Sequence, residues 1–327
     1  MVSRIVVSKE TPLHDPVKVL RAAVESATLP NGAQGAVAEA AAGLDPGSPA
    51  YVELLRWAAS GGSPVDERFA VTLSLLARAQ EGDGEFTEAI TRFWSGDPIS
   101  VSQLRQEARL AGEPRPVLRP VRVRDLARQR FQFLDHLFSA AGARGWVLLF
   151  DEVELIGRYT PLQRGRSYGE IADWPTPDPD DPQSSIVTVL AMTDDFDAAV
   201  LTDKNDRELV PQRLRAKQTS DWDQVAARAE VGMRLLEREM VMLTQPDTAE
   251  LNRTYSSLKQ LHGQAFGWDP PDVEGLERLG ANRMRQYVRA WINEWDLTRL
   301  DPDFEPQTQC VDVRVTYDEF PDISPDD

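Results

Sequence analysis

The clearest secondary-structure signal in the sequence is Trp146-Val147-Leu148-Leu149-Phe150, followed directly by Asp151-Glu152. Five consecutive apolar residues predict a β-strand that is covered on both faces, as in a parallel sheet. A second apolar run, Ile186 to Met192, ends at Thr193-Asp194-Asp195. Because a helical stretch and a Pro/Asp-rich loop separate the two runs, the pattern predicts a strand–helix–strand unit with parallel strands. We therefore expect an α/β fold with Asp151 and Thr193 at the same edge of the sheet.

The other segments are organised around these two strands. A β-branched run from Arg4 to Val7 predicts a first strand, and apolar residues at helical spacing between Pro16 and Ala27 predict the helix after it. Three predicted segments form the core and its insertion: residues 1–35 are the first strand and helix of the core, 36–118 are a helical insertion, and 119–220 are the part of the core with the two strands above. Residues 221–317 are predicted to form a mostly helical C-terminal domain with a strand-like stretch at 311–315. Residues 318–327 are predicted to be a mobile acidic tail.

Composition limits the class of protein. The 327 residues include 36 Lys and Arg against 53 Asp and Glu, a formal net charge of −17, and 41% of the residues are apolar. No window has the 18 or more uncharged apolar residues that a membrane span needs, and the single cysteine, Cys310, excludes an internal disulfide. We therefore expect a cytoplasmic protein with no membrane partner. The acidity argues against nucleic-acid binding through net charge alone, although it leaves room for a local basic groove.

Asp151 and Glu152 are the first candidate site residues. An apolar strand followed by Asp-Glu is the Walker B pattern of ATPases, in which the first carboxylate faces Mg²⁺ and its waters and the second polarises the water that attacks the γ-phosphate. Asp151 would then be the magnesium residue and Glu152 the catalytic base. The same pattern fits a buried strand that ends in two solvated carboxylates, so the motif alone leaves both interpretations open.

Two further residues extend this candidate catalytic site. Thr193, at the end of the second strand, matches the sensor position that contacts the attacking water or the γ-phosphate, although an ordinary strand-end cap has the same sequence. Arg213, in the stretch Val210 to Arg215, matches the place where ring ATPases present an arginine to the neighbouring subunit. Arg164 and Arg166 are weaker candidates for that role. A plain solvated arginine is the alternative in each case.

The stretch Gly145 to Leu155, the following Arg164/Arg166/Tyr168 segment and Arg283 to Asp296 resemble the ATP-binding proteins of BREX phage-resistance systems, the BrxD-type family. The opening stretch, Val2 to Leu13, resembles the second strand of that family. The resemblance covers most of the chain and is looser in the helical insertion. It implies a P-loop NTPase-like parallel sheet with a helical insertion and a C-terminal helical lid, ATP and Mg²⁺ as cofactors, and Arg283 or Arg285 as lid arginines that contact phosphate.

The chain departs from that family in its phosphate-binding residues. A phosphate loop, G-x-x-x-x-G-K-[ST], needs a lysine directly after a glycine, and none of the five lysines follows one. We therefore expect an incomplete core without the first strand and the phosphate loop, which makes this chain inactive and leaves ATP hydrolysis to a full-length form. We also expect that the reading frame extends upstream or that the chain is a fragment, with the loop roughly 20–25 residues before Val2.

Other functions stay open as alternatives. A non-enzymatic scaffold or adapter that keeps the NTPase fold is the second hypothesis. A Mg²⁺-dependent nuclease using Asp151, Glu152 and Asp194 ranks last, because it lacks the lysine usually needed nearby. The expected partners are further copies of the chain or other defence-system proteins. DNA is a weaker candidate, through a helical face that carries Arg283, Arg285, Arg289 and Arg299.

Zinc and serine-nucleophile chemistry are not expected. His14, His136 and His262 are far apart in sequence, and together with Cys310 they match no recognised zinc spacing. The sequence also lacks a G-x-S-x-G nucleophile elbow. Most of the tryptophans fall in helical patterns, and we expect them to be core or interface residues.

Overall fold

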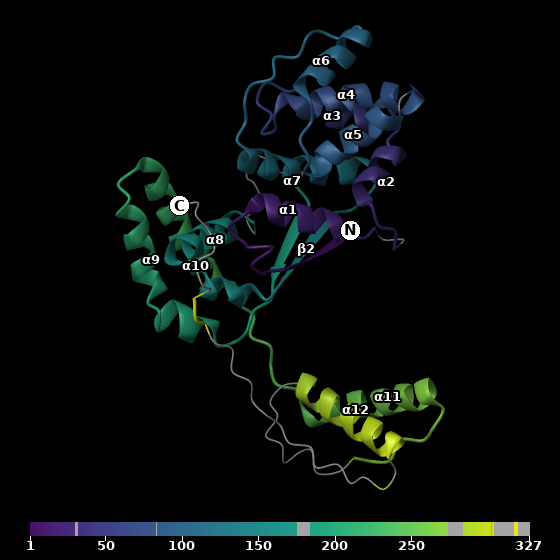
Figure 1. Cartoon of the computed structure of the whole chain (residues 1–327), viewed down its shortest axis with the longest axis vertical. Coiled ribbons are helices and arrows are strands. Elements are labelled where there is room, and N and C mark those ends of the chain that lie inside the picture. Colours follow the sequence, from purple (N-terminus) through teal and green to yellow (C-terminus); the bar gives the residue numbers. More distant parts are fainter. Residues whose placement is uncertain are drawn as a thin grey trace. The chain divides into compact units, whose positions relative to one another are not determined.

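The computed structural model describes residues 1–29, 32–82, 84–174, 184–273, 284–301, 303 and 317–319. The chain divides into two units (Figure 1): unit 1 comprises Met1–Met240 with Tyr317–Asp327, and unit 2 comprises Val241–Thr316. Unit 1 includes the helix at Ser220–Arg238, which the sequence pattern grouped with the C-terminal helices. The predicted strand at 311–315 lies outside the described residues.

Unit 1 contains a three-stranded sheet of β1 (Val2–Val6), β2 (Trp146–Asp151) and β3 (Ile186–Leu190). The strand order is β1-β2-β3 and both neighbouring pairs are parallel, with Val147 opposite Val2 on one side and Val187 on the other. The predicted parallel pairing of the two long apolar runs is therefore confirmed, and so is the α/β class. β2 is the central strand of the three, and the carboxyl ends of β2 and β3 lie at the same edge.

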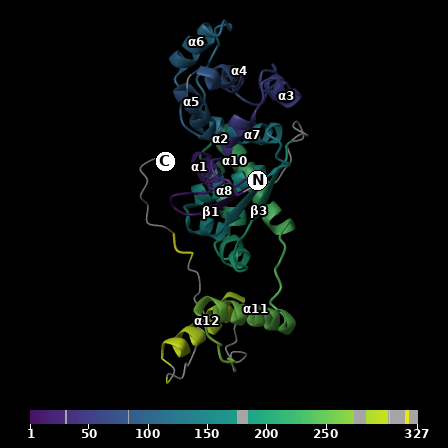
Figure 2. The same ribbon diagram turned by 90° about the vertical axis from the view of Figure 1, so that its right-hand side faces the viewer.

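Helices make up most of the rest of unit 1. The helices between β1 and β2 are α1 (Pro16–Glu25), α2 (Ala36–Gly43), α3 (Pro49–Ala58), α4 (Glu67–Gly82), α5 (Gly84–Ser95), α6 (Val101–Leu110) and α7 (Val123–Ala140). Figure 2 shows α3 to α6 gathered at one end of the unit, away from the strands. After β2 come the 3₁₀ helix η1 (Val153–Arg158), α8 (Pro161–Asp173), η2 (Asp197–Thr202), α9 (Asp206–Arg215) and α10 (Ser220–Arg238). No helix in the described ranges has both the length and the apolar character to cross a membrane.

Helices cover one face of the sheet. Each strand is added on the same side of the one before it, so right-handed crossovers place the connecting helices on a single face. Trp146 marks that face: its ring contacts Phe131 and Phe138 of α7, with centroids 5.6 and 5.2 Å away. Its Nε1 donates a hydrogen bond to Ser3 Oγ (2.9 Å), which donates to the carbonyl of Ala23 in α1 (2.6 Å).

The opposite face of the sheet is open within the described part of unit 1. Val2, Val6, Val187 and Val189, whose side chains alternate with the covered ones, are between 42% and 55% exposed. Among the described residues, no element covers this face, so the expectation of cover on both faces is not met there. A continuous apolar run shows that both sides of a strand are apolar, but it does not show that an element lies against each side. Because parallel sheets are almost always covered on both faces, this apolar surface is unusual.

Unit 2 contains α11 (Thr248–Phe266) and α12 (Met284–Leu300). Its buried core is made of Ala290, Trp291 and Trp295, all on α12. Trp295 Nε1 donates to the carbonyl of Pro271 (3.0 Å), so the indole satisfies its polar atom while its rings fill the core. The expected core role of the helical tryptophans is confirmed for Trp291 and Trp295 here and for Trp94 in unit 1.

Candidate functional site

The carboxyl ends of the strands form one edge of the sheet, called the rim below, and Asp151, Glu152 and Thr193 lie on it. Asp151 is the last residue of β2, and Thr193 follows the end of β3 by three residues. The backbone pairing continues past the strands, because Val153 N donates to the carbonyl of Ala191 (3.1 Å). Ligands of parallel α/β sheets bind at this edge. The structure therefore brings the three residues together on adjacent strand ends.

Asp151 is paired with an arginine. Arg4 Nη2 lies 2.8 Å from Asp151 Oδ2, and the two side chains are 69% and 42% exposed. The other carboxylate oxygen, Oδ1, accepts the backbone N–H of Glu152 (3.1 Å). An ion pair this exposed contributes at most about 1 kcal/mol. A cation that approaches Asp151 therefore displaces Arg4 at low cost.

Glu152 has a backbone conformation that residues other than glycine rarely adopt. Its φ is +58° and its ψ is +35°, in the left-handed region, immediately before η1. For a residue with a Cβ, this conformation costs roughly 1 kcal/mol. The turn ends β2 sharply and leaves the side chain exposed. The predicted base is thus open to solvent next to Asp151.

Glu154 is a rim residue that the sequence pattern missed. Its side chain is only 8% exposed, and burial raises the pKa of its carboxyl. A hydrogen bond from the backbone of Thr193 acts in the opposite direction, whereas the nearby carboxylates of Glu152 and Asp151 raise the pKa further. Its Oε2 atom makes no hydrogen bond within the described residues. The sequence Asp-Glu-Val-Glu does not distinguish this buried glutamate from the exposed Glu152. Their difference in burial arises from the left-handed backbone conformation at Glu152, between β2 and η1.

The hydroxyl of Thr193 is hydrogen-bonded to a distant tyrosine. Thr193 Oγ1 lies 3.0 Å from the hydroxyl of Tyr317, which donates to Asp195 Oδ1 at 2.8 Å. Because the carboxylate only accepts and Tyr317 has a single hydroxyl proton, Thr193 must be the donor in the first bond. Burial, together with the bond to Asp195, raises the pKa of the Tyr317 phenol, so the phenol keeps its proton at neutral pH. The predicted sensor hydroxyl is therefore engaged by Tyr317.

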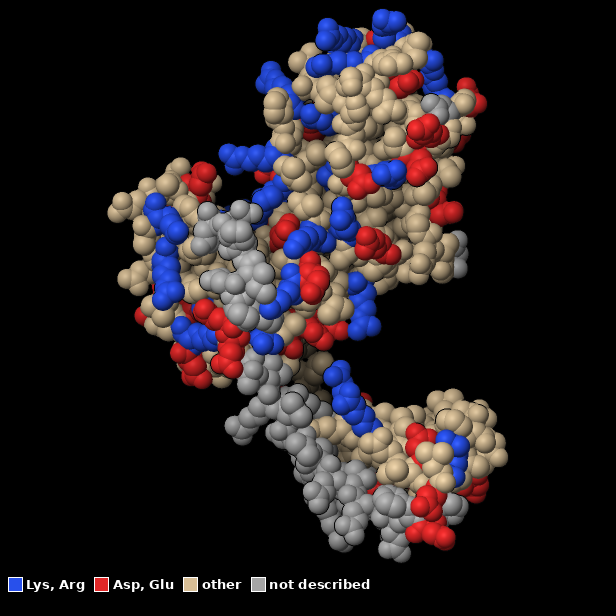
Figure 3. Space-filling view, viewed as in Figure 1, with Lys and Arg blue, Asp and Glu red and all other residues tan. Residues whose placement is uncertain are grey.

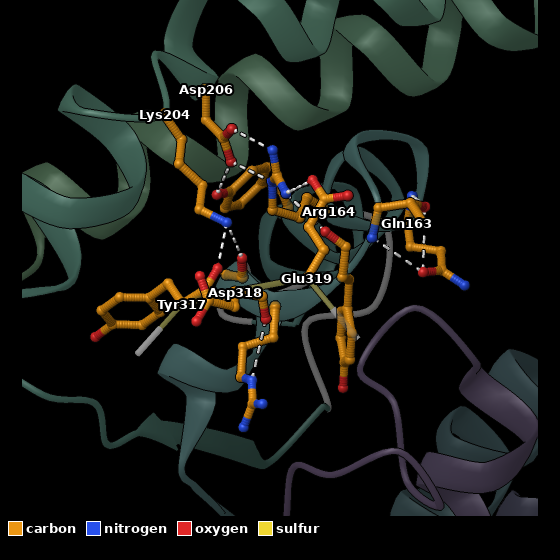
Figure 4. A network of polar contacts seen from close by, with 12 residues as sticks. Gln163, Arg164, Lys204, Asp206, Tyr317, Asp318 and Glu319 are labelled. Carbon is orange, nitrogen blue, oxygen red and sulfur yellow. Dashed lines mark hydrogen bonds and ion pairs between the residues drawn. The ribbon is translucent and has the colours of Figure 1, made fainter. Parts of the chain in front are cut away.

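Tyr317–Glu319 form a strap against the rim, shown in Figure 4. Lys204 Nζ donates to the carbonyls of Gly157 (3.0 Å) and Tyr317, and Arg158 Nε donates to the carbonyl of Asp318 (3.3 Å). The Tyr317 ring packs so closely that a Cβ added to Gly157 would lie 2.8 Å from its Cδ1. Asp318 and Glu319 were expected in a mobile tail, but they are held on unit 1. Residues 320–327 lie outside the described ranges.

The start of α8 places two polar side chains under this strap. Thr160 is the N-cap and forms a capping box with Gln163, and Pro161 occupies the first turn, where its missing N–H costs nothing. Arg164 and Tyr168 are four residues apart, and they therefore lie on the same side of α8. Both side chains are buried and both contact the first residue of α9.

That contact is a buried ion pair between Arg164 and Asp206. Arg164 Nε and Nη2 donate to the two Asp206 carboxylate oxygens at 2.8 and 2.9 Å, and the side chains are 4% and 0% exposed. The Tyr168 hydroxyl donates to the same carboxylate (2.7 Å). The interpretation of Arg164 as an arginine presented to a neighbouring subunit is therefore wrong, because this guanidinium is enclosed. Arg166 lies over the ring of Trp222, 4.7 Å from its centroid.

The remaining predicted arginines are Arg213, Arg285 and Arg283. Arg213 is exposed on α9 and forms no ion pair within the described part of the chain. Arg285 is exposed on α12, which belongs to unit 2. Arg283 lies outside the described residues. The lid role of Arg283 or Arg285 stays a prediction from the resemblance, and the role of Arg213 toward a neighbouring subunit stays a prediction from the sequence pattern.

The rim fits a magnesium ion only together with a phosphate ligand. No group of three or more His, Cys, Asp or Glu side chains in the described ranges is arranged to hold a metal ion. At nucleotide sites, Mg²⁺ is held by one or two carboxylates, by phosphate oxygens and by waters. Asp151 matches the carboxylate of such a site. The arrangement gives no support to a nuclease centre built on Asp151, Glu152 and Asp194.

Comparisons with models of known protein families, with curated proteins and with solved structures gave no match to this chain. The class that the structure defines is thus an α/β protein with a three-stranded parallel sheet and a polar rim at its carboxyl edge. The resemblance to the BREX family stays a prediction from the sequence.

Proposed function

We propose that this protein is an ATPase-type component of bacterial phage defence, of the BREX kind, and that the chain by itself binds ATP only weakly. One observation carries the proposal: Asp151 ends the central strand of three parallel strands, Glu152 follows it, and Thr193 lies three residues past the end of the strand beside it. This is the placement in which one carboxylate orients Mg²⁺, the next polarises water and a hydroxyl contacts phosphate.

The side chains at the rim support these roles to different degrees. The ion pair between Asp151 and Arg4 is exposed and weak, so a cation that arrives with a triphosphate can displace Arg4. Glu152 is exposed beside it and can accept a proton from water. Thr193 must first exchange its bond to Tyr317 for a bond to the ligand. Bound Mg²⁺ would supply charge neutralisation between the phosphates.

Weak binding follows from the missing phosphate cradle. In P-loop proteins, backbone N–H groups of a glycine-rich loop and a neighbouring lysine hold the phosphates, and no lysine of this chain follows a glycine. We expect a dissociation constant for Mg-ATP no tighter than about 1 mM, or roughly −4 kcal/mol. Titration calorimetry of the whole chain with Mg-ATP measures this value, with Asp151→Asn as the matched control. Saturable micromolar binding would show that the phosphate site is complete in a form we have not recognised.

A non-enzymatic scaffold is the second candidate, and the open sheet face favours it. Val187 and Val189 on β3 are 55% and 48% exposed, on a face that parallel sheets normally cover. A protein that had given up nucleotide chemistry could use such a face for assembly. The same titration separates the two candidates: a scaffold shows no heat from Mg-ATP at any concentration up to about 10 mM, whereas an incomplete ATPase site gives weak binding that Asp151→Asn abolishes.

A further inference from the structure

Positive charge is concentrated in one segment of this acidic chain. Residues 101–130 carry eight arginines against three acidic residues, a local net charge of +5, whereas the whole chain has a net charge of −17. This segment comprises α6, the connector at residues 111–122, and the start of α7. Figure 3 shows Lys and Arg side chains gathered over α6 and the connector, at the upper end of unit 1. The local sign of charge is therefore opposite to that of the molecule.

Four of these arginines face solvent without a counter-ion. Arg109 at the end of α6 and Arg115, Arg119 and Arg122 on the connector are exposed, and none forms an ion pair within the described residues. Two neighbours on α7 behave differently, because Arg124 and Arg128 approach Glu170 at 3.6 and 2.5 Å. The four exposed arginines, called the arginine row below, are thus charges that the fold does not neutralise.

The connector holds this row in an extended form. It has no helix or strand, and Pro114, Pro116 and Pro120 restrict its backbone. It is fixed to the unit at intervals: Pro116 is buried, and the carbonyl of Arg119 accepts a hydrogen bond from Arg68 (2.9 Å). From Arg115 to Arg122 an extended chain reaches at most about 25 Å. The row is therefore long, anchored and positively charged.

We propose that the arginine row binds the phosphodiester backbone of duplex nucleic acid without reading its bases. Guanidinium groups match phosphate geometry with two parallel hydrogen bonds. A duplex offers a continuous line of charge, about one per 1.7 Å of axis, that a row of this length can follow. Residues 101–130 contain no Phe, Tyr or Trp, so the segment lacks the stacking platforms that single-stranded nucleic acid requires.

The proposal predicts a definite salt dependence. Each phosphate neutralised contributes about −0.9 to the slope of log K against log salt concentration, so four arginines give a slope near −3.6. Because the rest of the chain is acidic and repels nucleic acid, the contact should be measured at low ionic strength, near 50 mM NaCl.

The test is fluorescence anisotropy of a labelled 20-base-pair DNA duplex, titrated with the whole chain. The test variant combines Arg109→Gln, Arg115→Gln, Arg119→Gln and Arg122→Gln. The matched control combines Arg21→Gln, Arg56→Gln, Arg234→Gln and Arg253→Gln, which removes the same charge from exposed positions elsewhere. Far-ultraviolet circular dichroism checks that both are folded, and the single reversal Arg115→Glu provides a milder second variant.

We expect the wild type and the control to bind alike, the test variant to bind at least tenfold more weakly, and its salt slope to fall by about three to four. Arg115→Glu weakens binding in the same direction. Equal losses in the test and control variants, or no binding by the wild type at 50 mM NaCl, would overturn the proposal. Tighter binding to single-stranded DNA, or to a poly-glutamate peptide, would also overturn it, because the row would then serve another class of ligand. None of these outcomes depends on ATP binding.

Discussion

Asp206→Asn is predicted to be among the most destabilising polar substitutions in unit 1. The change removes one charge from the ion pair with Arg164, in which Asp206 and Arg164 are 0% and 4% exposed, and leaves the buried guanidinium with only the half-exposed carboxylate of Glu319, 3.3 Å from its Nη1. Breaking a buried pair in this way costs about 3–5 kcal/mol. The exposed pair between Arg4 and Asp151 provides the comparison, since Asp151→Asn should cost at most about 1 kcal/mol.

Urea denaturation followed by circular dichroism and tryptophan fluorescence measures both costs, with the unfolding of units 1 and 2 fitted as separate transitions. The double variant Arg164→Met with Asp206→Leu should recover at least about half of the loss, because no unpaired charge is then buried. It does not recover everything, since the hydroxyl of Tyr168 loses its acceptor. A cost below about 1 kcal/mol for Asp206→Asn, or equal costs for Asp206→Asn and Asp151→Asn, would refute the assignment of this pair to the core.

Three further substitutions test other parts of the structure. Gly232→Ala should destabilise unit 1 by about 3 kcal/mol or more, because the new Cβ would overlap the carbonyl oxygen of Tyr168. The control is Gly61→Ala, whose new Cβ meets no atom within 4 Å. In the same urea assay it should change the free energy of unfolding by less than about 0.5 kcal/mol. Glu152→Gly should stabilise the fold by up to roughly 1 kcal/mol, since it relieves the left-handed backbone strain, and a loss of stability would show that the Glu152 side chain makes a compensating contact. Burial lowers the pKa of His14 from 6.5 to about 4, so the unfolded chain binds a proton here at a higher pH than the folded chain does. The free energy of unfolding should therefore fall as the pH is lowered from 6.5 to about 4, and fall less in His14→Phe. Equal pH profiles of the two proteins would contradict this burial.

The sheet was predictable because its signal is local. Trp146 to Phe150 is a continuous apolar run, Ile186 to Leu190 is interrupted only by Thr188, and the helical stretch between them indicates the parallel direction of the strands. The same runs could not show which face is open. That outcome depends on the strand order, which places the connecting helices on one side and leaves Val187 and Val189 exposed on the other.

The polar network at the rim was not predictable, because its contacts join residues far apart in sequence. Arg164 and Asp206 are separated by 42 positions, and Thr193 and Tyr317 by 124. An arginine in the first turn of a polar helix has the sequence pattern of a solvated residue, and only the approach of α9 to α8 shows that Arg164 is enclosed. Tyr317 immediately precedes the acidic segment that was predicted to be a mobile tail. Its hydrogen bond to Thr193 is therefore visible only in the tertiary structure.

The nucleotide role of the rim is tested by mapping where Mg-ATP contacts the protein. Amide nitrogen–proton spectra of the labelled chain, recorded with up to about 5 mM Mg-ATP, report every residue whose environment changes. We predict weak, saturable shifts at Glu152 and Thr193 that are lost in Asp151→Asn and persist when the arginine row is replaced by glutamine. Shifts confined to the arginine row, with none at Glu152 or Thr193, would contradict the account and leave the rim without a nucleotide role.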